Sequence, residues 1–509
     1  MPTASHHLAA SPALYPSLVS PRPPTPKHSH SLPPPHLKSP MSKTRPPTRP
    51  TTPVSFSFSP TASFSRPKTP KQVQDFKYRG TPIVLDTWNP QPPLFPTSGS
   101  DADSPGEDDV FEREAMRRIV QLLFEVKEVT FDKAVEGTYN QIYIFRLRTR
   151  GDPNIPTSVL CRLSRPEKVQ SLISMRSEVE TMLYVRDRMS VPIPQVYGYS
   201  TSLALLGTTF IIMQHVTNAV PLTLALPTLS PLAKDELAKQ YARIIFQLSQ
   251  MRFLHIGSVR QDKTAGNFGV GSMSLFRTDR MARMTTSSYR SVRRSFPSVR
   301  EWAEAMERWE MRFLEEHPEL VEERFERSGD AAVKRANEAM SGIVHALPHV
   351  GAPDAVGRTF CLWHPELNAT NIMVRTQGPE EGQIVAIIDW EGAAILPLYM
   401  LCKLPDFFPS DAVSAARFDS VCLYELDRLD PKHLLSQAAD GRYEGQRTLV
   451  EAVLKPWWEW EGRERWLEEW SRGRNAGKGV PLTTGVGRKM QRSWTIGWGG
   501  GLKKRSQTM

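Results

Sequence analysis

This chain of 509 residues contains only four cysteines, and they are widely separated. Cys161, Cys361, Cys402 and Cys422 show neither a Cys-x-x-Cys pair nor the spacing of a Cys/His zinc site. We therefore expect neither a disulfide framework nor structural zinc, and we expect the protein to reside in a reducing compartment.

Long apolar runs are also missing from the sequence. The best candidate, Leu203 to Met213, is too short to cross a bilayer and is interrupted by Gly207 and two threonines. The N-terminus lacks the apolar core of a signal peptide. A membrane span is therefore not expected.

Acidic residues are absent from Met1 to about Lys71, where roughly a quarter of the residues are proline. Such a segment cannot bury enough apolar area to offset the entropy lost on ordering. We expect residues 1–109 to form a disordered Pro/Ser-rich basic tail that ends in an acidic linker, Asp101 to Asp109. The Pro-rich tail is itself a candidate for binding partner proteins.

The basic charge of the chain is divided between its two ends. The net charge of +10 comes substantially from the acid-free tail and from Lys478 to Lys504, so no single basic face is indicated and nucleic-acid binding is not expected. A Ser-rich, Arg-bearing tail without acids also fits a mitochondrial transit peptide, although its prolines oppose an amphipathic helix. We expect a cytoplasmic protein, with mitochondrial import as the alternative.

One stretch in the C-terminal half groups residues that carry chemistry. It contains His364-x-Glu366, then Asn371, then the apolar run IVAII that predicts a buried strand ending at Asp389. Phosphoryl transfer from ATP needs a carboxylate to orient the attacking hydroxyl, plus an Asn and an Asp to hold Mg²⁺. The stretch supplies these groups in that order, but with Glu366 where kinase catalytic loops carry Asp.

These residues resemble the aminoglycoside phosphotransferase and choline kinase-like family, especially its fungal members. LWHPELNATNIMV looks like that family's Brenner motif, and AIIDWEGAAILPL looks like its metal-binding motif. The resemblance covers roughly residues 110–470. It implies an α+β, two-lobed protein-kinase-like fold with a small β-rich N-lobe and a larger helical C-lobe.

The resemblance also implies domain boundaries and roles. The N-lobe would span 110–216 and the C-lobe 217–472, with an insert at about 256–345 that carries the specificity surface. Residues 473–509 would form a disordered basic tail. By position, Glu366 falls at the catalytic base and His364 at the residue that braces the loop, while Asn371 and Asp389 fall at the metal ligands. The implied cofactors are ATP and Mg²⁺, and the implied acceptor is a hydroxyl of a small molecule.

Four N-lobe residues fall at nucleotide-binding positions of the family. Gly137 and Asn140 lie at the phosphate-covering loop, although a single glycine also fits an ordinary hairpin turn. Arg162 lies near the end of a predicted strand, where kinases carry a phosphate-binding Lys, and Glu178 of the next helix would be its partner. The alternative is a strand-edge Arg and a solvated Glu.

Gln214 and Val216 fall at the hinge, where backbone groups of kinase-like folds bind adenine. Three interpretations stay open. The chain is an active small-molecule kinase, a pseudokinase whose base is impaired by Glu366, or an interaction protein that acts through its Pro-rich tail. Phosphoryl transfer distinguishes the first, and nucleotide binding distinguishes the second from the third. The substrate and the oligomeric state are not indicated by the sequence.

Overall fold

The computed structural model of this protein describes residues 82–86, 107–137, 140–165, 172–262, 267–274, 291–317 and 329–475. All of them lie in the second of the two units into which the chain divides, Gln72–Met509. Most of both expected tails fall outside the described residues, as do residues 263–266, 275–290 and 318–328 of the expected insert.

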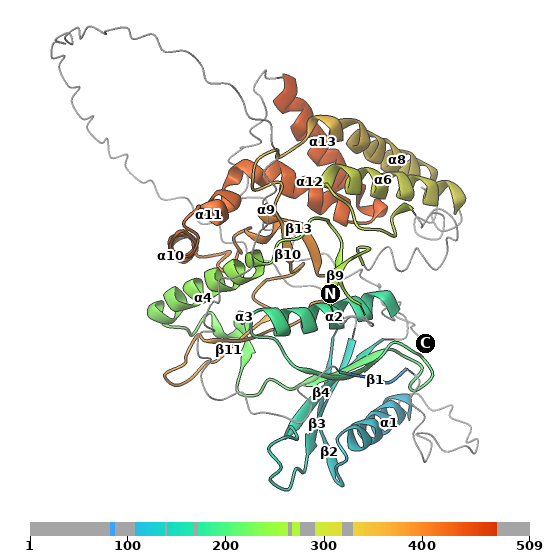
Figure 1. Cartoon of the computed structure of the whole chain (residues 1–509), viewed down its shortest axis with the longest axis vertical. Coiled ribbons are helices and arrows are strands. Elements are labelled where there is room, and N and C mark those ends of the chain that lie inside the picture. The colour runs from blue at the N-terminus through green and yellow to red at the C-terminus, as the bar shows by residue number, and fades with distance from the viewer. Residues whose placement is uncertain are drawn as a thin grey trace, which may run out of the picture. The chain divides into compact units, whose positions relative to one another are not determined.

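A six-stranded sheet with two helices forms the N-lobe (Figure 1). The strand order is β1-β5-β6-β4-β3-β2; β1 is parallel to β5, and every other neighbouring pair is antiparallel. The elements are β1 (Ile83–Val84), α1 (Glu107–Leu123), β2 (Val129–Glu136), β3 (Asn140–Leu147), β4 (Ser158–Ser164), α2 (Leu172–Arg188), β5 (Val196–Ser200) and β6 (Phe210–Gln214).

The period-2 alternation of the strands divides their side chains between the two helices. In β6, Phe210 and Ile212 belong to the buried cluster that contains α1, whereas Ile211 and Met213 belong to the cluster that contains α2. Alternation in β4 likewise turns Arg162 toward α2, because its neighbour Cys161 packs in the α1 cluster.

Strand β1 lies inside the segment that we expected to lack structure. Ile83 and Val84 pair with β5, and the Asp86 carboxylate accepts hydrogen bonds from the backbone N–H and hydroxyl of Thr201 at 2.6 and 2.7 Å. Helix α1 also begins before residue 110. Part of the expected tail therefore has regular structure: residues 82–86 through sheet pairing and hydrogen bonds with distant residues, and residues 107–109 as the first turn of α1.

The C-lobe is larger and mainly helical, so the expected two-lobed α+β fold is confirmed. Its helices are α3 (Leu222–Ala225), α4 (Pro231–Gln250), α6 (Val299–Glu316), α8 (Gly329–Ala346), α9 (Leu398–Leu401), α10 (Ala412–Leu429), α11 (Leu434–Ala439), α12 (Glu444–Leu454) and α13 (Trp460–Asn475), with short 3-10 helices η3 (Leu347–His349), η4 (Gly441–Tyr443) and η5 (Trp457–Glu459). Its strands are β7 (Val220–Pro221), β8 (Ser258–Gln261), β9 (Phe268–Gly271), β10 (Phe360–Trp363), β11 (Ile372–Val374), β12 (Ile384–Ile387) and β13 (Ala394–Pro397).

Local signals position several of these helices. Ser298 caps α6 by accepting a hydrogen bond from the backbone N–H of Glu301 at 3.2 Å, as its capping sequence predicts. Ser230 caps α4 in the same way through Ala233. Among the described residues, no helix is both long enough and apolar enough to cross a bilayer.

A buried charge cluster joins the last helix to the predicted insert. The Arg463 side chain of α13 is fully buried, and its Nε donates to both carboxylate oxygens of Glu307 at 3.0 and 2.9 Å. Its Nη2 donates to Glu310 at 2.9 Å. Both glutamates lie on α6, so one arginine fixes α13 against that helix.

Candidate active site

The loop between β10 and β11 is braced by a neutral histidine. The buried His364 ring donates through Nε2 to the carbonyl oxygen of Ile388 at 3.1 Å and accepts at Nδ1 from the backbone N–H of Glu366 at 3.1 Å. Burial lowers the pKa of His364 to about 4. The imidazole therefore joins the loop that carries Glu366 to the strand that ends before Asp389.

Asn371 is oriented by the same loop. The side-chain Nδ2 of Asn371 donates to the backbone carbonyl oxygen of Glu366 at 3.0 Å. The backbone carbonyl oxygen of Asn371 accepts from the backbone N–H of Ile388 at 3.0 Å. With the amide nitrogen directed to the loop, Oδ1 is the atom that remains to bind a cation. The turn before it is closed by Asn368, whose Oδ1 accepts from the Thr370 N–H at 2.9 Å.

Asp389 leaves the end of β12 in a left-handed backbone conformation, with φ of 63°. Such a conformation costs free energy in a non-glycine residue and is found most often where a site requires it. It brings the half-exposed carboxylate to within 3.7 Å of the Arg162 guanidinium. Partial burial raises the pKa of Asp389, and Arg162 opposes that rise.

Glu366 is exposed at the loop surface and faces the same region. The pKa of its carboxyl is raised by partial removal from water and by the charge of Asp389, while a hydrogen bond from Asn371 opposes the rise. The two carboxylates therefore interact electrostatically. A cation held at Asp389 would keep both ionised.

Arg162 and Glu178 form the expected pair. The guanidinium Nη2 donates to Glu178 Oε2 at 2.5 Å, and the side chains are 9% and 1% exposed. The alternative of a solvated glutamate is therefore wrong. Although burial acts against the charged form, Glu178 raises the pKa of Arg162, so the guanidinium stays charged.

Two site residues were missed in the sequence. Glu391 lies two positions after Asp389, and burial together with the charge of Glu178 raises its pKa to about 8. The Ser174 hydroxyl of α2 lies 3.5 Å from Glu391 Oε1. The second acid of the Asp-Trp-Glu sequence was the available signal for Glu391, whereas no local pattern indicates Ser174.

The structure places Gly137 and Asn140 at one turn. The Gly137 N–H donates to the carbonyl oxygen of Asn140 at 2.9 Å, and a Cβ on Gly137 would lie 3.0 Å from that oxygen, so the turn has little room for a side chain. The two residues between them lie outside the described stretches. Asn140 pairs with Ser164 across β3 and β4, and Ile142 pairs with Arg162, so this turn and Arg162 share one end of the sheet.

At the hinge, the groups of Gln214 that were expected to bind adenine include a backbone N–H that already has a partner within the protein. The backbone N–H of Gln214 donates to the carbonyl oxygen of Gln195 at 2.7 Å, and its side chain accepts from the Gln195 N–H at 3.2 Å. Both groups are therefore engaged with the residue that precedes β5. Val216 is half-buried after β6 and remains a prediction.

Asn371 and Asp389 could together hold Mg²⁺. Both offer oxygen ligands, and Mg²⁺ commonly uses one or two carboxylates together with phosphate oxygens and water. No group of three or more His, Cys, Asp or Glu side chains arranged for a metal occurs among the described residues.

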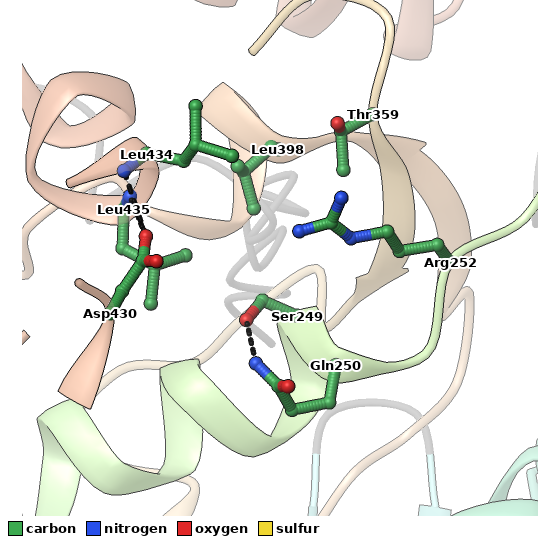
Figure 2. A pocket seen from close by; sticks show the side chains of 8 residues that line it. All are labelled: Ser249, Gln250, Arg252, Thr359, Leu398, Asp430, Leu434 and Leu435. Carbon is green, nitrogen blue, oxygen red and sulfur yellow. Dashed lines mark hydrogen bonds between the residues drawn. The ribbon is translucent and has the colours of Figure 1, made fainter. Parts of the chain in front are cut away.

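A small cavity lies elsewhere in the C-lobe, at the C-terminal end of α4 (Figure 2). Figure 2 shows the Arg252 side chain reaching into it from the side opposite Asp430. Its volume of about 20 Å³ is room for little more than a water molecule. It is therefore too small for a nucleotide. The lining residues are Ser249, Gln250, Arg252, Thr359, Leu398, Asp430, Leu434 and Leu435.

Comparison with known proteins gives one family match. The model of the phosphotransferase enzyme family matches residues 134–400, more than half of the chain. A subtelomeric hrmA-associated cluster protein, found in two strains of Aspergillus fumigatus, is 24% identical over 319 residues. That match covers 55% of this chain, and the chain spans only 60% of the length of these curated relatives.

Several solved structures are also similar. The streptomycin–ATP–APH(2")-IIa ternary complex matches with a TM-score of 0.37 and 13% identity, over 73% of this chain and 97% of that chain. The ADP-bound aminoglycoside phosphotransferase APH(2'')-Ib matches with a TM-score of 0.36 and 12% identity, over 69% of this chain and 95% of that chain.

Proposed function

This chain belongs to the phosphotransferase enzyme family, and we propose that it transfers the γ-phosphoryl group of ATP, with Mg²⁺, to a hydroxyl of a small molecule. The observation that carries the proposal is the convergence of Glu366, Asn371, Asp389 and Arg162. Asn371 donates to the carbonyl oxygen of Glu366, and His364 joins the Glu366 N–H to Ile388, the residue before Asp389. A contact of 3.7 Å connects Asp389 to Arg162.

The proposed nucleotide site combines a fixed cation with two oxygen ligands. Arg162 would bind the α- and β-phosphates, because its charge is held in place by Glu178 and its guanidinium can donate two parallel hydrogen bonds. Asn371 Oδ1 and the Asp389 carboxylate would hold Mg²⁺. When bound, this ion neutralises charge on the phosphate oxygens.

Glu366 is the proposed orienting base for the acceptor. The acceptor oxygen attacks the γ-phosphorus while the bond from that phosphorus to the bridging β-phosphate oxygen breaks, and ADP leaves. The hydroxyl proton passes to the Glu366 carboxylate. Partial removal of the Glu366 carboxylate from water raises its pKa and suits this role, because a base is most effective when its pKa lies near the working pH.

A second candidate is nucleotide binding without catalysis. Glu366 carries one methylene more than the Asp of kinase catalytic loops. A displacement of about 1 Å in a catalytic group can lower the rate on the order of 10²-fold. This candidate would keep the roles of Arg162, Asn371 and Asp389 and would lack the step at Glu366.

The proposed acceptor side includes the insert at 256–345, of which β8, β9, α6 and most of α8 are described. The four cysteines are unpaired and buried, which supports a location in a reducing compartment such as the cytoplasm. Partners of the Pro-rich tail remain part of the proposal, because that tail lies outside the described residues.

A thermal-shift series tests the nucleotide site first. ATP and ADP should raise the melting temperature more with Mg²⁺ than with a chelator, by mass action on the folded state. ATP consumption would then be measured over a library of hydroxyl metabolites. Stabilisation without turnover would favour the second candidate, and no stabilisation at millimolar nucleotide would contradict both.

A further inference from the structure

The C-lobe contacts helix α2 on two of its faces. Ser174 and Glu178 lie one turn apart on the face toward the proposed active site. Arg176 and Glu180 lie one turn apart on a different face, against strand β8. On the first face Ser174 Oγ is 3.5 Å from Glu391, and on the second Glu180 Oε2 is 3.9 Å from Nη1 of Arg260.

Three polar contacts from C-lobe side chains to α2 and to Arg162 are longer than the ion pairs that α2 makes within the N-lobe. Arg162 and Glu178 are 2.5 Å apart, and Arg176 and Glu180 are 2.6 Å apart. The contacts made by the C-lobe residues Glu391, Asp389 and Arg260 measure 3.5, 3.7 and 3.9 Å. Charged hydrogen bonds usually span about 2.7–2.9 Å. Each of these three distances would therefore have to shorten by roughly 1 Å to become such a bond.

The Glu180 carboxylate would be stabilised by a closer approach of Arg260. The Glu180 side chain is 6% exposed, and one oxygen accepts from Arg176 at 2.6 Å. The other oxygen, Oε2, is buried and has no hydrogen bond among the described residues. A buried carboxylate oxygen without a donor is costly, so approach of the Arg260 guanidinium would be favourable.

We propose that Arg260 is a positioning residue for the nucleotide site. By binding Glu180 it fixes the rotation of α2, and α2 carries Glu178, which in turn holds Arg162. The proposal rests on the proposed function, in which Arg162 binds the phosphates. It assigns to the β8–β9 hairpin, in the insert, the task of closing α2 against the bound nucleotide.

Binding of ADP with Mg²⁺ to the full chain, measured by calorimetry, tests this role. Arg260→Gln removes the charge and should weaken binding about fivefold or more, a typical size for coupling between sites. Arg260→Lys should keep most of the affinity. Glu180→Gln should weaken binding to the same extent as Arg260→Gln, and the double variant should be no weaker than either single variant.

Arg176→Gln is the matched control. Arg176 lies on α2 and is the other partner of the Glu180 carboxylate. Its replacement should leave the ADP affinity within about twofold of wild type, since the contact between α2 and the C-lobe is kept. A loss caused only by a destabilised helix would be equal in Arg176→Gln and Arg260→Gln, and would overturn the proposal.

Hydrogen exchange of the wild-type chain supplies a measurement that needs no variant. ADP with Mg²⁺ should slow exchange both in residues 172–188 and in residues 258–261. Wild-type binding with unchanged exchange at 258–261, or with unchanged affinity in Arg260→Gln, would overturn this inference and leave the proposed function standing. A wild-type chain that binds no nucleotide would overturn both.

Discussion

The imidazole of His364 lies 3.1 Å from the carbonyl oxygen of Ile388, which places a buried neutral histidine one residue away from the proposed metal ligand Asp389. Because the ring must accept from the Glu366 N–H at the same time, protonation would remove one of its two hydrogen bonds. The order of the loop therefore depends on keeping this ring uncharged.

The first prediction concerns pH and His364. Its pKa falls from 6.5 to about 4 on folding, so between these values the unfolded chain binds the extra proton. The stability that this group contributes is present above pH 6.5 and is lost as pH falls toward 4, in total about 3 kcal/mol. His364→Gln should remove this slope in chemical denaturation with a chelator present.

The contribution of Glu391 to the pH dependence of stability has the opposite sign, which provides a comparison within the same protein. The pKa of Glu391 rises from 4.5 to about 8, so its contribution is favourable below pH 4.5 and is lost as pH rises. Between pH 4.5 and 6.5 the two contributions oppose each other, so stability should rise with pH in Glu391→Gln, which keeps the His364 contribution, and fall with pH in His364→Gln, which keeps the Glu391 contribution. Equal slopes in wild type and both variants would contradict the assignment.

The second prediction concerns the backbone at Asp389. Because φ is 63°, glycine fits this position without strain, and Asp389→Gly should be more stable to urea than Asp389→Ala by about 1 kcal/mol. Both variants should lose the Mg²⁺-dependent part of nucleotide stabilisation. If both fold and still respond to Mg²⁺ as wild type does, Asp389 is not a metal ligand.

The third prediction concerns Glu366 as the base. Glu366→Gln removes the charge at nearly constant shape and should lower turnover by roughly 10²-fold or more. The dissociation constant for ADP should change little, because this side chain is proposed to contact the acceptor. Glu366→Asp separates the two candidate functions: it should be slower than wild type in an enzyme adapted to Glu and should gain activity in a chain impaired by it. Identical background hydrolysis in all three proteins would exclude catalysis through this residue.

The fourth prediction concerns Arg463. Arg463→Met leaves Glu307 and Glu310 buried without their shared cation, and it should lower the free energy of unfolding by about 3–5 kcal/mol. The control is Arg335→Met on the neighbouring α8, whose pair with Glu464 is solvent-exposed and should contribute about 1 kcal/mol or less. Similar losses in urea denaturation would contradict a special role for the buried cluster.

The features predicted correctly from the sequence are those that have local signals. Arg162 was placed on a strand and Glu178 on the helix that follows it, and both elements have patterns that depend on residues within a few positions of one another. The loop from His364 to Asn371 was also accessible, because its hydrogen bonds connect neighbours along the chain.

The features that were missed depend on partners far apart in the sequence. Arg463 and Glu307 are separated by 156 positions, and Ser174 and Glu391 by 217. Neither pair has a periodic pattern, since each residue alone is an ordinary polar position on a helix or loop. For the same reason the hinge assignment of Gln214 did not anticipate its pairing with Gln195, which depends on the register of β5 against β6.

The hydrogen bonds between Asp86 and the turn after β5 move the start of the folded unit upstream of the expected boundary at residue 110. A chain shortened to start near Asp109 would keep most of α1 but would leave β5 as an open edge, and the backbone N–H groups of Thr201 and Ser202 would lose their hydrogen bonds to Asp86. Unprotected edges of this kind are templates for intermolecular strand pairing. The smallest soluble fragment should therefore start upstream of Ile83. In such a fragment β1, from the expected tail, covers the edge of β5 and prevents that edge from pairing with other chains.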